Sequence, residues 1–328
     1  MMSKKKVSQE KAHKLSELIS YYEVCNKAGG KSPRTISWYS ANLHQFRAYV
    51  LNRHHSENVN SIDPKLIREY ILFLMSKHRF EKHPYNTPTD EPLSSSTIHG
   101  HVRTLRAFSN WLLKENLTDT NLTSGIKPPK IVKKVISPLS DEEINQIINT
   151  FNPTSHSEMR NKVMFMLLLD TGLRIGELIS LKIDDIHIDD GLMKVMGKGK
   201  KERMVPIGNK AQKALQSYFF RYRPKPAHFN INNVFLSVFG TPITENSVEL
   251  MFSRLARKSG IKRLHAHLCR HTFATMYLLN GGDVFTLQQI LRHSTLEMVK
   301  NYVTLASNHV AMQHHKYSPL DRLSSRSI

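Results

Sequence analysis

The chain has 328 residues, 40% of them hydrophobic, which suits two folded domains of ordinary size. Its 47 lysines and arginines outnumber 27 acidic residues, and the net charge of +20 favours a polyanionic partner over self-association. The longest apolar run, Val163 to Leu169, is too short to cross a bilayer, which excludes a transmembrane protein, and the N-terminus lacks the apolar stretch of a secretory signal.

The N-terminal part of the chain has the pattern of a helical domain. Residues 1–10 are polar and basic, and we expect them to be flexible. Within residues 11–122, Ser32 and Asp63 each precede a proline and an apolar pattern of helical spacing. Each pattern predicts a helix that the serine or aspartate caps.

A further helix is predicted from Ser94 to Asn116, with an apolar stripe on one side. Its other sides are polar and carry Arg103 and Arg106. A basic face of this kind is either a solvated surface or a contact for phosphates, and the helix pattern alone leaves both interpretations open.

A basic segment, residues 123–139, follows this domain. It contains three prolines, which stiffen a chain, and no acidic residue. The lysines that we expect to contact phosphates there are Lys127, Lys130, Lys133 and Lys134. We therefore expect an interdomain linker that lies along a polyanion.

Residues 140–306 have the pattern of a second domain. Ser140 and Glu143 form a capping box at its start, and an apolar helix follows. Two β-rich stretches, 191–196 and 203–206, flank a glycine-containing turn and predict a hairpin. Helical patterns then occupy residues 209–223, 244–259, 267–279, 284–291 and 295–306. The predicted fold is mainly α with a small β-hairpin in the C-terminal domain.

Two sequence motifs in this domain carry residues suited to binding a phosphate. Arg174 lies at a predicted helix start after a glycine turn, where backbone N–H groups favour an anion, and Glu177 is placed to hold its guanidinium. Lys198 lies at the tip of the predicted hairpin and can present a mobile ammonium as a proton donor. Taken singly, these are more often a surface ion pair and an exposed basic turn.

Two further motifs follow along the chain. His267 and Arg270 share a helix face. His267 and His271 also have the spacing of a zinc helix, but no carboxylate lies near and the surrounding positive charge opposes a dication. His293 precedes a predicted helix start, and Tyr302 lies two turns into that helix. A lone tyrosine is usually a core or surface residue, so only the order of its companions singles it out.

That order resembles the active-site series of the tyrosine recombinases, the phage-integrase and Xer family. The blocks that carry the resemblance are Thr171-Gly-Leu-Arg-Ile-Gly-Glu-Leu, Gly197-Lys-Gly-Lys-Lys-Glu-Arg-Met-Val-Pro and Arg270-His-Thr-Phe-Ala-Thr. The sequence departs at Arg292, where many members have glycine, and at Cys269, where leucine is more usual. Neither departure removes a reacting group.

The resemblance implies a transesterification through a 3′-phosphotyrosine with a free 5′-hydroxyl. The catalytic residues that it implies are Tyr302 as nucleophile, Arg174, Lys198, His267, Arg270 and His293, with Glu177 in support. The arginines would neutralise the phosphate, the histidines would donate hydrogen bonds or move protons, and Lys198 would protonate the leaving oxygen. Since one ester replaces another, we expect no cofactor and no metal.

The resemblance also implies a two-domain clamp on double-stranded DNA with a specific core site. Residues 11–122 would be a SAM-like core-binding domain and 140–306 the catalytic domain; 307–328 would be a tail that exchanges between protomers of a homotetramer on two duplexes. We also expect an accessory directionality protein. The basic residues expected on DNA are Arg103, Arg106, Lys127, Lys130, Lys133, Lys134, Lys200, Lys201 and Arg203.

We favour an integrase or excision recombinase of a mobile element, which acts on core sites only because about ten residues precede the first helix. A Xer-like dimer-resolution recombinase and a type IB topoisomerase-like enzyme remain open, and the complete residue set argues against a DNA-binding protein without catalysis. Cys25 and Cys269 are the sole cysteines, which suits the cytoplasm, where we expect nucleoid association.

Overall fold

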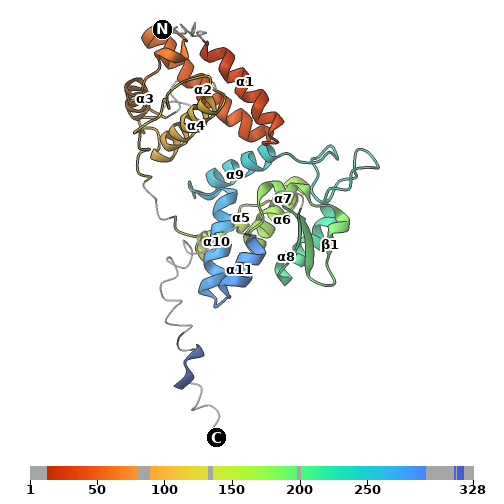
Figure 1. Cartoon of the computed structure of the whole chain (residues 1–328). Coiled ribbons are helices and arrows are strands. Elements are labelled where there is room, and N and C mark those ends of the chain that lie inside the picture. Colours follow the sequence, from red (N-terminus) through yellow and green to blue (C-terminus); the bar gives the residue numbers. More distant parts are fainter. Residues whose placement is uncertain are drawn as a thin grey trace, which may run out of the picture. The chain divides into compact units, whose positions relative to one another are not determined.

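A computed structural model of the chain describes residues 13–79, 89–131, 136–197, 201–292, 314 and 316–320 (Figure 1). The chain forms two compact units, residues 1–135 and 136–328, which we describe separately. The predicted flexible N-terminus and nearly all of the predicted tail lie outside the described residues, and so does the helix predicted for 295–306.

The first unit is helical in its described part. Its elements are α1 (Leu15–Ala28), α2 (Pro33–His54), the 3-10 turn η1 (Val59–Ser61), α3 (Pro64–Ser76) and α4 (Ser95–Lys114). The side chains of Ser32, Asp63 and Ser94 accept hydrogen bonds at the starts of α2, α3 and α4, which confirms the predicted starts of these helices. The helix α1 begins close to the position expected for the first helix, about ten residues into the chain, and Leu15, Leu18 and Ile19 give it a buried face at helical spacing.

The core of the first unit is rich in aromatic rings, including buried Phe46, Tyr70 and Phe108. The chain after α4 returns to this core, because Ile126 is buried in it and the carbonyl of Ile126 accepts a hydrogen bond of 3.0 Å from Arg106 Nη2. Residues 123–126, expected in the linker, therefore pack on the first unit.

The second unit combines helices with a small sheet. Its helices are α5 (Asp141–Asn149), α6 (His156–Thr171), α7 (Ile175–Ser180), η2 (Ile183–Asp185), α8 (Asn209–Ser217), the π-helical η3 (Tyr218–Tyr222), α9 (Glu245–Ser259), α10 (Ala266–Leu279) and α11 (Val284–Leu291). Its strands are β1 (Ile186–His187), β2 (Leu192–Met196) and β3 (Glu202–Pro206). They form an antiparallel sheet in the order β1-β2-β3.

The pairing of β2 with β3 confirms the predicted hairpin, since Leu192 lies opposite Pro206 and Met196 opposite Glu202. The two-residue strand β1 is too short to leave a pattern in the sequence. The capping box of Ser140 and Glu143 is confirmed at the start of α5. The mainly helical fold with a small sheet is thus as predicted.

The residues before α5 are attached to α10. The backbone N–H of Leu139 donates to Thr272 Oγ1 at 2.9 Å, and His271 Nε2 donates to the carbonyl of Ile136 at 2.6 Å. These bonds fix the start of the second unit on the helix that carries two predicted site residues. In the described part of the chain, no helix is both long and apolar enough to span a membrane.

Candidate active site

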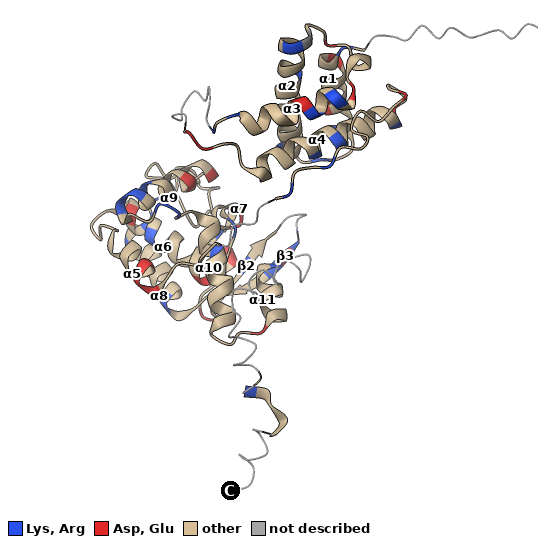
Figure 2. Cartoon of the chain, turned by 90° about the vertical axis from the view of Figure 1, so that its left-hand side faces the viewer, with Lys and Arg blue, Asp and Glu red and all other residues tan. Residues whose placement is uncertain are grey.

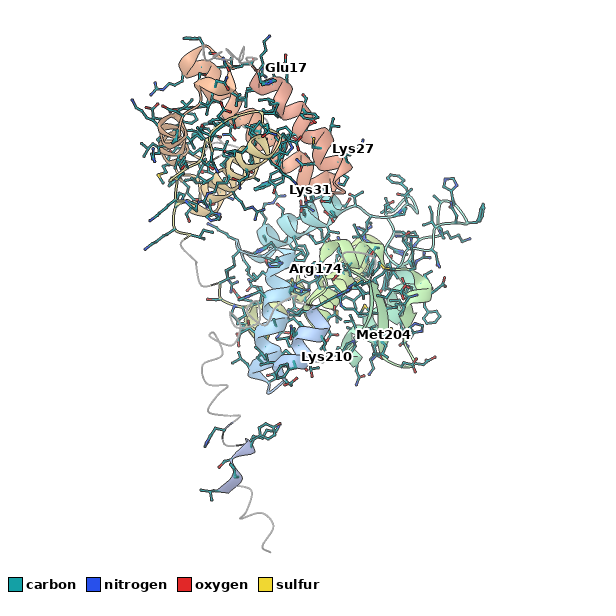
Figure 3. All side chains as sticks on the ribbon, viewed as in Figure 1. Glu17, Lys27, Lys31, Arg174, Met204 and Lys210 are labelled. Atoms are coloured by element: carbon teal, nitrogen blue, oxygen red, sulfur yellow. The ribbon has the colours of Figure 1, made fainter. Side chains whose placement is uncertain are left out.

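Arg174 lies where α6 ends and α7 begins. Gly172 ends α6 in the left-handed conformation, with φ 63°, and Arg174 is the N-cap of α7. Glu177 binds Arg174 twice: its carboxylate accepts from the Arg174 backbone N–H at 2.9 Å and from Nη1 at 3.1 Å. Because Glu177 is buried whereas the Arg174 side chain is 46% exposed, the guanidinium is held from one side and open to solvent on another. Figure 3 labels Arg174 among the side chains of the second unit.

Arg203, expected on the DNA surface, has a different environment. Side chains alternate along β3, so Met204 is exposed and labelled in Figure 3, whereas the Arg203 side chain is 9% exposed. Its Nη1 and Nη2 each lie 3.0 Å from an oxygen of Glu177, and its Nε donates to the carbonyl of Ile290 at 3.0 Å. The structure therefore corrects the expected phosphate contact: the Arg203 guanidinium is directed into the protein.

The Glu177 carboxylate is ionised by these partners. Burial acts to raise its pKa, but the hydrogen bonds from Arg203 and the Arg174 backbone, together with both positive charges, lower the pKa below its usual value. One carboxylate thus holds a buried and an exposed guanidinium at once.

Arg270 is buried, with 1% of its surface exposed. Its Nη1 donates to the carbonyl of Gly172, and its Nη2 donates to the carbonyl of Leu291 at 2.7 Å. Gly172 comes two residues before Arg174, and Leu291 comes two residues before the predicted His293. The guanidinium therefore joins the two chain segments that lead to these predicted site residues.

His267 lies on the first turn of α10 and lines an open pocket of about 790 Å³ that α7 and α9 border through Ile175, Phe252 and Ala256. The protein around the imidazole lowers its pKa by desolvation, and the charges of Arg270 and Arg174 add to this effect. The imidazole is therefore neutral at pH 7, with one N–H donor and one acceptor.

The β2–β3 hairpin lies beside the end of α11. The backbone N–H of Gly197 donates to the carbonyl of Lys201 at 3.0 Å, and the same carbonyl accepts from Arg292 Nη1 at 2.7 Å. Arg292 ends α11 in the left-handed conformation.

Hydrogen bonds link Arg174 to Glu177 and Arg270 to the segment before Arg174, and His267 lies near enough to both arginines for their charges to lower its pKa. Six predicted site residues lie outside the described residues: Lys133, Lys134, Lys198, Lys200, His293 and Tyr302. Of the other predicted DNA contacts, Lys127, Lys130 and Lys201 are exposed. Figure 2, with lysine and arginine in blue, shows further basic residues around α9.

Two predicted contacts on α4 are exposed and have protein partners. The Arg103 guanidinium carbon lies 5.1 Å from the centre of the Trp38 ring, a cation–π distance, and Arg106 binds Ile126 as described above. Neither arginine is withdrawn into the core as Arg203 is.

The zinc-helix alternative gains no support from the geometry. His271 Nε2 donates to the carbonyl of Ile136, and His265 Nδ1 lies 2.7 Å from the carbonyl of Arg263. Across the described ranges, no three histidine, cysteine or acidic side chains gather as metal ligands.

Comparison with known proteins relates both units to the same protein family. Residues 138–309 match the phage integrase family, and residues 17–127 match the phage integrase SAM-like domain. The chain is 32% identical over 278 residues to tyrosine recombinase XerD of Halalkalibacterium halodurans, which covers 83% of this chain and 87% of that protein. It is 29% identical over 292 residues to XerD of Staphylococcus haemolyticus, which covers 88% and 94%.

Solved structures share the fold. The Tn1549 transposon integrase in complex with transposon right end DNA has a TM-score of 0.70 and 20% identity, over 93% of this chain and all (100%) of that one. The XerH site-specific recombinase bound to a palindromic difH substrate has a TM-score of 0.69 and 20% identity, over 92% of this chain and 84% of that one.

Proposed function

Because the chain belongs to the phage integrase family of tyrosine recombinases, enzymes that cleave and rejoin DNA, we propose that it exchanges strands at a specific core site. The core site would lie in double-stranded DNA, and Tyr302 would be the nucleophile. Both solved relatives named above are bound to DNA, which supports duplex DNA as the partner.

One observation carries the proposed site: Arg270 bonds to the carbonyls of Gly172 and Leu291. These bonds hold the segment of Arg174 next to the segment that continues to His293. Two segments from distant parts of the sequence thereby meet at one buried guanidinium, which supports a shared site.

The proposed cleavage is a transesterification at a phosphodiester. The Tyr302 phenolate attacks phosphorus, a P–O bond to tyrosine forms, and the bond from phosphorus to the 5′-oxygen breaks. The exposed Arg174 guanidinium donates to the non-bridging oxygens, and the buried Arg270 guanidinium adds its positive charge to the same region. Lys198 donates a proton to the departing 5′-oxygen. His267, which is neutral at pH 7, and His293 each donate a hydrogen bond to the phosphate. The reverse steps, with a new 5′-hydroxyl, rejoin the strand, so the bond energy is retained.

The clamp, the tetramer and the directionality protein belong to the same proposal. We propose the first unit as the core-binding domain and Lys127 and Lys130 as phosphate contacts near its end, since both are exposed. Affinity for duplex DNA should then fall steeply as salt concentration rises, because bound phosphates release counterions.

The test is covalent trapping. A nicked suicide duplex that carries the cognate core site is mixed with the protein. We expect a covalent protein–DNA adduct with the parent protein and none with Tyr302→Phe, which should bind the duplex with unchanged affinity. An adduct formed by Tyr302→Phe would show that another residue is the nucleophile.

We propose recombination of a mobile element as the biological role, with dimer resolution as a second candidate. The second is favoured by the XerD relatives, which cover 83% and 88% of the chain. A cell-based assay separates them: an element recombinase excises DNA between its ends as a circle, whereas a resolution enzyme converts plasmid dimers to monomers. Resolution of dimers without excision would overturn the first role.

A further inference from the structure

The β2–β3 hairpin and the end of α11 meet at Gly197. A Cβ atom built on Gly197 would lie 2.9 Å from Arg292 Nη1 and 3.6 Å from Arg203 Nη1. Two guanidinium groups, one from each side of this junction, therefore lie against the backbone of the residue directly before Lys198. The glycine leaves the space that the two arginines occupy.

Arg292 has a backbone conformation that residues with side chains rarely adopt. Its φ of 48° and ψ of 54° are left-handed, and its N–H ends α11 by donating to Gln288 and Gln289 carbonyls. Glycine adopts this conformation without the clash of a Cβ atom. An arginine at such a position therefore indicates a use for its side chain.

The side chain reaches the hairpin. Arg292 Nη1 donates to the Lys201 carbonyl at 2.7 Å, and that carbonyl also accepts from the N–H of Gly197 at the end of the preceding described segment. A second link runs the other way, because Arg203 Nε on β3 donates to the carbonyl of Ile290 in α11. The hairpin and the end of α11 are thus tied together twice.

We propose that Arg292 is a positioning residue for Lys198, because it ties Lys201, three residues after Lys198, to the end of α11, one residue before His293. The inference rests on the proposed function, in which Lys198 is the general acid. Loss of the Arg292 side chain should therefore impair proton donation to the leaving oxygen, while the other steps continue.

The chemistry offers a readout specific to that proton. In cleavage the P–O5′ bond breaks, its electron pair goes to O5′, and O5′ takes a proton from the Lys198 ammonium. When sulfur replaces O5′, the P–S bond breaks and a thiolate leaves. A thiol has a pKa of about 8.5, whereas water, the reference here for the O–H group of the sugar, has one near 15.7. A thiolate is therefore stable enough to depart without a proton donor.

The experiment compares cleavage of two nicked suicide duplexes, one with O5′ and one with sulfur at the scissile position. We expect Arg292→Gly to cleave the oxygen duplex roughly tenfold more slowly than the parent, a smaller loss than the roughly 10²- to 10⁴-fold effect of removing the general acid itself. On the sulfur duplex its rate should be within about twofold of the parent rate, since no general acid is needed there. Glycine suits the left-handed backbone, so thermal unfolding of this variant should occur at or above the parent temperature.

Two controls make the result specific. Lys198→Ala should show the same selective recovery with sulfur. Lys201→Ala removes a nearby cation but keeps the acceptor carbonyl, so any loss should affect both duplexes equally. If Lys198→Ala recovers with sulfur and Arg292→Gly does not, the role of Arg292 is wrong and the proposed function stands. If Lys198→Ala does not recover, Lys198 is not the general acid, and the inference falls with that assignment.

Discussion

Arg203 on β3 and Glu177 in α7 form a two-pronged ion pair, with Nη1 3.0 Å from Oε1 and Nη2 3.0 Å from Oε2. Both side chains are less than a tenth exposed, at 9% and 6%. The same carboxylate holds the exposed Arg174 guanidinium. The orientation of the proposed catalytic arginine therefore depends on a buried arginine from another element.

Removal of Arg203 should strongly destabilise the second unit. Arg203→Met leaves the buried Glu177 carboxylate with one partner fewer, and loss of one member of a buried pair lowers the free energy of unfolding by about 3 to 5 kcal/mol. Adding Glu177→Gln, which removes the uncompensated charge but keeps an acceptor for the Arg174 N–H, should recover part of this loss. Urea unfolding of the single and double variants measures both effects. A loss below about 1 kcal/mol for Arg203→Met would be typical of a surface pair and would contradict this role.

His267 should take up its proton at a lower pH than an ordinary histidine does. Its pKa is lowered by desolvation and by the charges of Arg270 and Arg174. The unfolded chain takes up a proton near the usual value of 6.5, whereas the folded chain does so only at lower pH. The contribution of His267 to folding is therefore greatest above pH 6.5 and declines as the pH falls from 6.5 toward the folded-state pKa. An NMR titration of the imidazole in the whole protein measures this directly, with His267→Asn to assign the signal. A midpoint at or above 6.5 would contradict the prediction.

Gly172 should not tolerate a side chain. It has φ +63°, and a Cβ atom there would lie 2.6 Å from both Leu291 Cδ2 and Phe273 Cδ1. Gly172→Ala should therefore lose about 1 to 2 kcal/mol from the left-handed backbone and about 1 to 3 kcal/mol from overpacking.

Gly260 provides the matched control. Its φ is +71°, but nothing lies within 4 Å of a Cβ built there, so Gly260→Ala should lose only the backbone part. Urea unfolding of both variants isolates the packing part. If the two variants lose the same free energy of unfolding, the neighbours of Gly172 on α10 and α11 move aside for the new methyl group at no cost.

Arg174→Lys should impair chemistry more than DNA binding. An ammonium cannot reproduce the planar fork that Glu177 orients, and loss of one positioned donor typically lowers a rate by about 10²-fold or more. Arg221→Lys, an exposed arginine on η3 to which we assign no role, should cleave within about twofold of the parent. Single-turnover cleavage and gel-shift affinity on the suicide duplex separate rate from binding. Cleavage by Arg174→Lys at the Arg221→Lys rate would remove Arg174 from the proposed machinery.

The sequence by itself determined the features that depend on neighbours a few residues apart. The caps at Ser32, Asp63 and Ser140 and the antiparallel hairpin all follow from local hydrogen bonding and from the conformational preferences of proline and glycine. The family resemblance also rests on local sequence, because it depends on short motifs and on their order along the chain.

Only the tertiary structure decided what the basic residues do. Arg203 stands in a run of cations that predicts a phosphate contact, yet β3 directs it toward Glu177, 26 positions earlier in the chain. Arg292 bonds to Lys201 across a separation of 91 positions. A guanidinium has the same charge on a surface and in a core, so composition and spacing cannot distinguish the two environments. Its partners are set by how strands and helices pack, and that packing turns two of the positive charges into internal supports of the site.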